Sequence, residues 1–291
     1  MSLNRNWTLL LLLLPLALLL GVFVVWPAAL GLLHSFTRVS GGASAALEWV
    51  GLENYARVVS QGEFASAVRN GSVLTTLSVS LELSLGLGLA CALRLPFRGR
   101  TLVRAGLLIP WLVSPVASGV MWRGLLLPSS GLLHYGFALL HLPGPPNPLD
   151  AHTALLTVTL CEVWRKVPLA TALLLLPGVL AIQRPLWDHA ALEGLSGWGH
   201  FRHLLWPGMR PLLLTVGLLL TADALLTAES ILQLSGGGPG SATITLGLLS
   251  YEQTVKAYNP ALGAAAGWLL ALAVSAVSLV YGVALTRSRR R

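Results

Sequence analysis

The chain has 291 residues, of which 55% are apolar and only 10% are charged. A soluble domain carries about 25% charged residues, so this composition excludes an ordinary soluble protein and predicts an integral membrane protein. The net charge of +8 does not indicate nucleic-acid binding, because the charges lie in short segments between long apolar blocks. The two cysteines, Cys91 and Cys161, lie inside apolar blocks and predict small packing residues rather than a disulfide.

Six apolar segments follow one another along the chain, and a membrane-spanning helix needs about 20 such residues. The first segment is too long for the apolar core of a signal peptide, which covers about 7–15 residues. We therefore expect an all-α integral membrane protein with a single transmembrane domain over 1–291 and six transmembrane helices, near 7–34, 72–93, 105–127, 153–182, 212–234 and 257–286.

Lysine and arginine residues are distributed unevenly between alternate loops. If the N-terminus faces the cytoplasm, twelve of them lie inside and four lie outside, the four being Arg38, Arg57, Arg69 and Lys256. Cytoplasmic segments of membrane proteins carry an excess of these residues. We therefore expect both termini and the loop at 184–210 to face the cytoplasm.

Nucleotide-binding and metal-binding motifs are absent from the sequence. A P-loop needs Gly-Lys followed by Ser or Thr, and neither lysine, Lys166 or Lys256, follows a glycine. The sequence also lacks HExxH and Cys-x-x-Cys, and its seven histidines are dispersed. We expect no catalytic residue, no metal site and no cofactor bound by this chain.

Charged residues inside the predicted spans are candidates for function, because each costs about 3 kcal/mol at the centre of a bilayer. They are Glu82, Glu162, Arg165, Lys166, Asp223 and Glu229. Glu162 and Lys166 stand at i, i+4 on one helix and can pair without a substrate, whereas Arg165 lies on a neighbouring face and is freer. Asp223 and Thr227 have the same spacing on the fifth span.

A polar segment between the fourth and fifth spans contains Asp188 to Leu192, which is predicted to be a short helix. We expect Gly194, Gly197 and Gly199 to break it, with Gly194 in a backbone conformation that favours glycine. Pro211 suits the first turn of the next helix.

Three motifs carry a family resemblance. The polar segment reads Trp187-Asp188-His189-Ala190, Glu193-Gly194-Leu195, Phe201-Arg202 and Trp206-Pro207, and it resembles the EAA loop of bacterial ABC importer permeases. Asp188 and Glu193 exchange the two acids of that pattern, and His189 and Leu195 replace alanines. Gly51 to Tyr55 resembles the GLENY element of carbohydrate-type permeases, and 235–239 resembles the TGGP turn after their fifth span.

The resemblance implies a type I ABC importer permease fold in the bacterial cytoplasmic membrane. The EAA loop would be a coupling helix that docks on an ATPase through Asp188, Ala190, Glu193, Gly194, Phe201 and Pro207. The implied partners are a second permease in a heterodimer, two ATPase subunits that bind ATP and magnesium, an extracytoplasmic solute-binding protein and the lipid bilayer. The implied path for a sugar or sugar-like solute includes Trp164, Arg165, Asp223 and Thr227.

Alternatives remain open at the level of sequence. Trp164 suits packing between helices as well as it suits a sugar ring. A proton-coupled secondary transporter would use Glu82 or Asp223 as a proton relay, but such folds often have repeated halves and no convincing internal repeat occurs here. A membrane-embedded enzyme is a weaker alternative, because no catalytic constellation is present. The sequence identifies neither the sugar nor the partner subunits.

Overall fold

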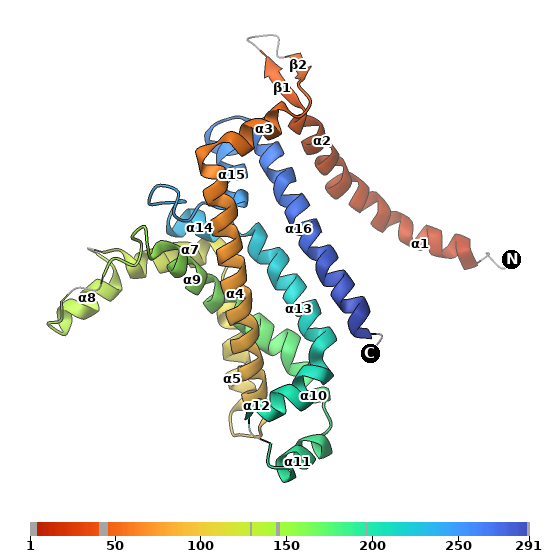
Figure 1. Ribbon diagram of the computed structural model, residues 1–291, viewed down its shortest axis with the longest axis vertical. Coiled ribbons are helices and arrows are strands. Elements are labelled where there is room, and N and C mark those ends of the chain that lie inside the picture. The colour runs from red at the N-terminus through yellow and green to blue at the C-terminus, as the bar shows by residue number, and fades with distance from the viewer. Residues whose placement is uncertain (1–4, 41–45, 129, 144–145, 196, 290–291) are drawn as a thin grey trace. The chain divides into compact units, whose positions relative to one another are not determined.

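A computed structural model describes residues 5–40, 46–128, 130–143, 146–195 and 197–289. This part of the chain is mostly helical, with one two-stranded antiparallel sheet (Figure 1). The chain forms two compact units. The first contains Met1–Gln61 and Leu249–Leu269, and the second contains Gly62–Leu248 and Leu270–Arg291.

The first unit begins with a long apolar helix and a hairpin. Helix α1 (Arg5–Leu20) continues through a π-helical turn, η1 (Gly21–Val25), into α2 (Trp26–Ser35). Strands β1 (Thr37–Ser40) and β2 (Ala46–Trp49) then pair in antiparallel register. This hairpin corrects the all-α expectation. Strands of four residues are too short to produce a clear alternating apolar pattern.

The segment that resembles the GLENY element begins α3 (Glu53–Ser60) and ties the hairpin to α2. The buried side-chain amide of Asn54 donates hydrogen bonds to the carbonyl oxygens of Ser35 and Thr37, at 2.9 and 2.8 Å. Glu53 forms an ion pair with Arg38 of β1. Since a buried amide is costly without partners, Asn54 fixes the end of α2 at this position.

The remaining elements of the first unit come from the C-terminal part of the chain. They are the end of α15 (Leu246–Tyr251), the π-helical turn η4 (Glu252–Lys256) and the start of α16 (Pro260–Arg289). The Ser250 hydroxyl donates to the Gly263 carbonyl oxygen at 2.8 Å. A Cβ atom at Gly263 would lie 1.8 Å from Thr254 Oγ1, so only glycine permits this close approach.

The second unit is organised around α4 (Gly62–Arg94). Three segments pack against it: α9 (Ala154–Pro168), its π-helical continuation η2 (Leu169–Leu175), and α13 (Trp206–Leu226), as Figure 1 shows. A Cβ atom at Gly86 would lie 3.2 Å from the Ala170 side chain, so the helices approach closely there. Helix α10 (Leu176–Ala181) completes the fourth apolar segment.

The third apolar segment is bent rather than straight. It forms α5 (Arg100–Leu107), α6 (Ile109–Leu112) and α7 (Pro115–Leu126), with a bend of 92° before α7. The Ser114 hydroxyl accepts the backbone N–H of Ala117 at 3.2 Å, and Pro115 has no N–H to donate. These two residues start a new helix at this point. The short helix α8 (Leu132–Leu139) follows.

The fifth helix has different ends from those predicted at 212–234. It begins at Gly197 as α12 (Gly197–His200), continues as η3 (Phe201–Leu205) and α13, and ends at Leu226. Residues 229–234 form a separate helix, α14 (Glu229–Leu234), which packs on α7. Pro211 and Gly199 therefore lie inside helices that they do not break. Membrane helices tolerate proline because neighbouring groups satisfy the freed carbonyl.

Five helices in the described part of the chain are long and apolar enough to cross a membrane, and the bent α5–α7 segment would make a sixth. Helix α4 starts ten residues before the predicted second span. Its first turns are polar, and the side-chain amide of Asn70 there donates to the carbonyl oxygens of Ser241 and Ile244 at 2.8 and 3.1 Å. Hydropathy identifies only the apolar part of a helix. The polar start of α4, where Asn70 makes its hydrogen bonds, lies outside that part and was therefore not predicted.

Candidate functional site

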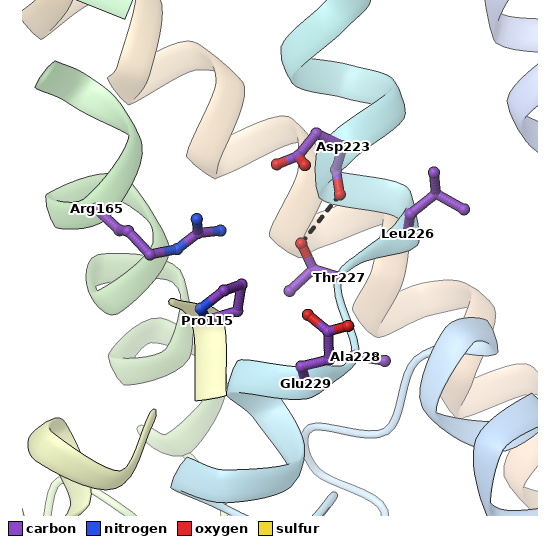
Figure 2. A pocket seen from close by; sticks show the side chains of 7 residues that line it. All are labelled: Pro115, Arg165, Asp223, Leu226, Thr227, Ala228 and Glu229. Atoms are coloured by element: carbon purple, nitrogen blue, oxygen red, sulfur yellow. Dashed lines mark hydrogen bonds between the residues drawn. The ribbon is translucent and has the colours of Figure 1, made fainter. Parts of the chain in front are cut away.

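A polar cavity lies in the second unit where α13 ends and α14 begins. It has a volume of about 230 Å³ and is lined by Pro115, Arg165, Asp223, Leu226, Thr227, Ala228 and Glu229 (Figure 2). A second cavity of about 270 Å³ shares Arg165 and Asp223 and adds Trp111, Lys166, Leu169, Leu174, Leu219 and Leu220. The two cavities are therefore neighbours. We call them together the polar cavity pair.

The break between α13 and α14 creates this site. Thr227 has an extended backbone, and its hydroxyl donates to the carbonyl oxygen of Asp223 at 3.0 Å. The Thr245 hydroxyl donates to the Thr227 carbonyl oxygen at 3.3 Å. Gly119 lets α14 lie close to α7, because a Cβ atom there would lie 2.7 Å from the Ser230 carbonyl oxygen. Non-helical backbone inside an apolar segment is tolerated where it is buried or lines a cavity.

Four charged side chains join α9 to α13 beside the cavities, and we call them the ion-pair cluster. Glu162 lies 2.9 Å from Lys166 and 3.0 Å from Arg165, and Lys166 lies 2.6 Å from Asp223. The Ser230 hydroxyl donates to Glu162 at 2.5 Å. Glu162 and Lys166 are 0% and 2% exposed, whereas Asp223 is 59% exposed. The cluster therefore has a buried core and one end open to the cavities.

The predicted pairing of Glu162 with Lys166 is confirmed. The prediction that Arg165 is freer was wrong, because its guanidinium also binds Glu162. An i, i+3 neighbour reaches the same carboxylate as an i, i+4 neighbour. Figure 2 shows Arg165 pointing from α9 towards Asp223 and Thr227 across the cavity.

The structure brings together three of the four residues predicted for the solute path. Arg165, Asp223 and Thr227 line one cavity. Trp164 lines neither cavity of the pair and instead packs edge-on against Trp122, with ring centroids 5.8 Å apart. A part in transport stays a prediction for all four.

Several residues of the site were missed at the level of sequence. The contact between Lys166 and Asp223 joins helices that are far apart in the chain, and Ser230, Pro115 and Trp111 carry no charge that would single them out. The sequence signal that could have revealed the contact between Lys166 and Asp223 was the presence of opposite charges in two apolar segments. Glu229 was placed inside a span, but it stands at the first position of α14 and lines the cavity.

Glu82, the other candidate for a proton relay, lies inside the closed interior of the second unit. Its side chain is buried on α4, and neither carboxylate oxygen has a hydrogen-bond partner among the described residues. It lines neither cavity of the pair. The two candidate acids therefore occupy different environments, since Asp223 opens into the cavities and Glu82 does not.

The polar loop forms α11 (Arg184–Leu192), which ends at a glycine turn. Gly194 has φ of +70°, as its position predicted, and the Leu195 N–H donates to the Ala190 carbonyl oxygen at 3.1 Å. This is the Schellman arrangement that ends helices. No atom lies within 4 Å of a Cβ atom built on Gly194, so its backbone conformation alone requires glycine.

The six residues predicted for ATPase contact differ in exposure. Asp188, Glu193, Gly194 and Pro207 are exposed, whereas Ala190 is buried. Phe201 is half-buried and stacks on Trp198, with ring centroids 5.2 Å apart. The exposed acids are available to a partner, and Ala190 packs within the chain.

An aromatic and cationic stack connects the loop to α4. The guanidinium carbon of Arg94 lies 3.8 Å from the centre of the Trp187 ring, and Trp187 stacks on His200 with centroids 5.9 Å apart. We call these three side chains the coupling-loop stack. Arg94 also lines a cavity of about 410 Å³ with Arg100 and Asp188. The end of α4, α11 and α12 are thereby held together.

Comparison with known proteins gives clear matches to individual relatives, although no family model matches the chain. The trehalose/maltose transport system permease protein MalF of Thermococcus litoralis is 33% identical over 205 residues, which cover 70% of this chain and 69% of that protein.

Two solved structures have the same fold. A bacterial ABC transporter involved in the import of the acidic polysaccharide alginate matches with a TM-score of 0.81 at 18% identity, over 98% of this chain and 96% of that chain. A bacterial alginate ABC transporter in complex with an alginate pentasaccharide-bound periplasmic protein matches with a TM-score of 0.79 at 17% identity, over 95% and 93%.

Of the function classes left open by the sequence, these likenesses support the ABC importer permease. The two matched structures are of ABC transporters, and the relative is named as the permease protein of a trehalose/maltose transport system. The chain is therefore a membrane-embedded transport subunit and not an enzyme, and a proton-coupled carrier is not supported. This chain belongs to the permease subunits of carbohydrate-type ABC importers.

Proposed function

We propose that this chain carries a sugar or sugar-like solute across the bacterial cytoplasmic membrane by alternating access. The observation that carries the proposal is the polar cavity pair at the break between α13 and α14. Ligand sites are concave and combine apolar walls with a few placed polar groups. Here Leu219, Leu220 and Leu226 supply apolar walls, and Asp223 and Thr227 supply oxygens that suit sugar hydroxyls.

The energy for transport comes from separate ATPase subunits in this proposal. The loop at 184–210 docks on them, and they bind the ATP and magnesium, so this chain holds no cofactor. The exposed acids Asp188 and Glu193 beside the Gly194 turn support a docking role.

A second permease completes a heterodimer in this proposal, and an extracytoplasmic binding protein delivers the solute. Support for the delivery step comes from one of the two matching transporters, which was solved in complex with a periplasmic protein that holds an alginate pentasaccharide. The same route of delivery is proposed for this chain.

The proposed topology has six spans, with both termini and the 184–210 loop in the cytoplasm. It rests on the excess of Lys and Arg in those segments. Single cysteines in a variant without Cys91 and Cys161 test it in intact cells. We expect Leu192→Cys, at an 84% exposed position, to react with a membrane-impermeant maleimide only after permeabilisation, and Val255→Cys to react from outside. The reverse pattern would contradict the topology.

Reconstitution tests the function itself. The permease pair and its ATPases are placed in proteoliposomes with the binding protein, and uptake of labelled sugars is measured. We expect uptake that requires ATP and stops without it. Uptake driven by a proton gradient in the absence of ATP would overturn the proposal and favour a secondary transporter.

The matched proteins leave the charge of the solute undecided. One is named for trehalose and maltose, which are neutral, and another imports an acidic polysaccharide. The proposed function therefore extends only to a sugar or sugar-like solute.

A further inference from the structure

The charges around the polar cavity pair are almost balanced. Among the described residues that line the two cavities, Arg165 and Lys166 are the only cationic ones. Both are already bound to carboxylates of the chain: Glu162 contacts each of them, and Asp223 contacts Lys166 at 2.6 Å. A solute that carries a carboxylate or a phosphate would have to compete with these two carboxylates, one of which, Glu162, is fully buried.

The cations are also poorly accessible. The Arg165 side chain is 11% exposed, and the Lys166 ammonium is held between two acids. Withdrawing either cation from Glu162 would leave that carboxylate buried and less completely paired, which is strongly unfavourable. The cations therefore serve to neutralise the chain's own carboxylates.

One carboxylate on the cavity wall has no cationic partner in the described part of the chain. Glu229 is exposed and lines the first cavity (Figure 2). The ion pairs beside this cavity are made by Glu162 and Asp223 instead. Because the four charges of the ion-pair cluster cancel one another, Glu229 is the one unpaired charge among the described residues that line the cavities. An anionic solute would meet a like charge there, whereas a cationic solute would lie beside Arg165 and Lys166.

We propose that the solute which passes through this cavity pair is an uncharged polyhydroxy compound, and that the cavity walls select against anionic sugars. This inference rests on the proposed function. Exposed carboxylate oxygens of Asp223 and Glu229 accept hydrogen bonds from hydroxyl groups without a change of charge. The Trp111 ring in the second cavity adds an apolar surface for a pyranose face.

Sugar binding to the assembled membrane complex tests the inference. The complex is purified without the binding protein and placed in nanodiscs. Glucose, maltose and trehalose are each compared with their 6-phosphates by equilibrium dialysis, so that the members of a pair differ in one phosphate group. Like charges at close range repel each other, and exposure of Glu229 to solvent weakens that repulsion. We expect the phosphorylated members to bind at least about tenfold more weakly.

Substitutions at Glu229 make the test specific to the cavity. Glu229→Gln removes the unpaired charge, so we expect a smaller ratio of the affinity for a neutral sugar to the affinity for its 6-phosphate. Glu229→Lys is expected to lower this ratio further or reverse the preference. Glu63→Gln, the same change at an exposed acid in the first turn of α4 and outside both cavities, is the matched control and should leave the ratio unchanged. Size-exclusion chromatography checks that each variant complex is assembled.

The inference fails if the phosphorylated sugars bind as tightly as the neutral ones, if no neutral sugar of the panel binds, or if Glu229→Lys leaves the ratio unchanged. ATP-dependent uptake separates this failure from failure of the proposed function. Uptake of a phosphorylated or carboxylated sugar that requires ATP would overturn the inference and leave the importer function intact. Absence of any ATP-dependent uptake would overturn the function itself.

Discussion

The ion-pair cluster and the polar loop at 184–210 are both polar regions of a mainly apolar chain, yet they are held in place in different ways. In the cluster, side chains from α9 and α13 neutralise one another, and the central groups Glu162 and Lys166 are buried. In the loop, the acids Asp188 and Glu193 are exposed, and a backbone turn at Gly194 sets the geometry. Charge in the interior is kept by pairing, whereas charge in the loop remains available to a partner.

Removal of the central cation of the cluster should have the largest effect. Lys166→Met leaves Glu162 buried with Arg165 as its single cationic partner, and it leaves Asp223 without Lys166. We expect a loss of about 3–5 kcal/mol in the free energy of unfolding. Unfolding of the purified complex in increasing SDS measures it.

A double substitution controls this prediction. Glu162→Gln combined with Lys166→Met removes both buried charges, so it should recover part of the lost stability. An unchanged stability in the single variant would show that the cluster is not what holds α9 to α13.

Asp223 tests the exposed end of the cluster. Asp223→Asn keeps the shape of the side chain but loses the charge that Lys166 contacts and that a solute hydroxyl would meet. Hydrogen bonds to charged groups contribute about 1.5–3 kcal/mol, so we expect transport kcat/KM to fall by about 10- to 100-fold. Asp223→Leu should have at least this effect while the complex still assembles. Wild-type kinetics in both variants would show that Asp223 takes no part in transport.

Gly194 tests the backbone of the loop. A Cβ atom at Gly194 has no neighbour within 4 Å, but Gly194→Val places a branched residue in the left-handed region, which costs about 1–2 kcal/mol. We expect weaker ATPase retention on the purified permease and less ATPase stimulation by the loaded binding protein. Gly194→Asn is the matched control, because asparagine accepts this conformation, and it should retain most of both activities. If both variants retained the ATPase and stimulated it as the wild type does, the loop would be a simple connector.

Arg94 should have the smallest effect. Arg94→Ala removes the cation above Trp187, and since both residues are half-buried we expect this contact to contribute about 1 kcal/mol. We expect faster hydrogen exchange across 184–195 with little change in global stability. Arg98→Ala, at an exposed position shortly after α4, is the control and should not alter exchange. Identical exchange in the two variants would remove the coupling-loop stack as a link between α4 and the loop.

The sequence was sufficient where local chemistry decides the structure. Gly194 was placed correctly at a turn because only glycine adopts that backbone freely, and Glu162 and Lys166 were paired correctly because i, i+4 neighbours meet on a helix. The ends of the helices were harder to predict from the sequence. Pro211 and Gly199 have helix-breaking preferences, but both lie in the continuous helix that begins at Gly197.

The long-range part of the site could not be read from sequence. Lys166 meets Asp223 because α9 and α13 both pack on α4, and Gly86 of α4 permits the close approach of η2, the continuation of α9. Ser114 and Pro115 bend the third segment by 92°, which hydropathy alone does not reveal. The edge-on contact between the Trp164 and Trp122 rings likewise depends on which faces of two helices pack together.

By itself, the sequence determined that the chain lies in a membrane, that it lacks an ATPase motif and that it carries the loop pattern of an importer permease. These properties follow from apolar length, from missing motif residues and from residues close together in the chain. Tertiary structure alone decided that α13 stops at Leu226, that Glu229 faces a cavity and that both cations beside the cavity pair are already neutralised. Each of these depends on contacts between distant helices, because an ion pair or a helix break inside an apolar interior is stable only when other helices supply its partners.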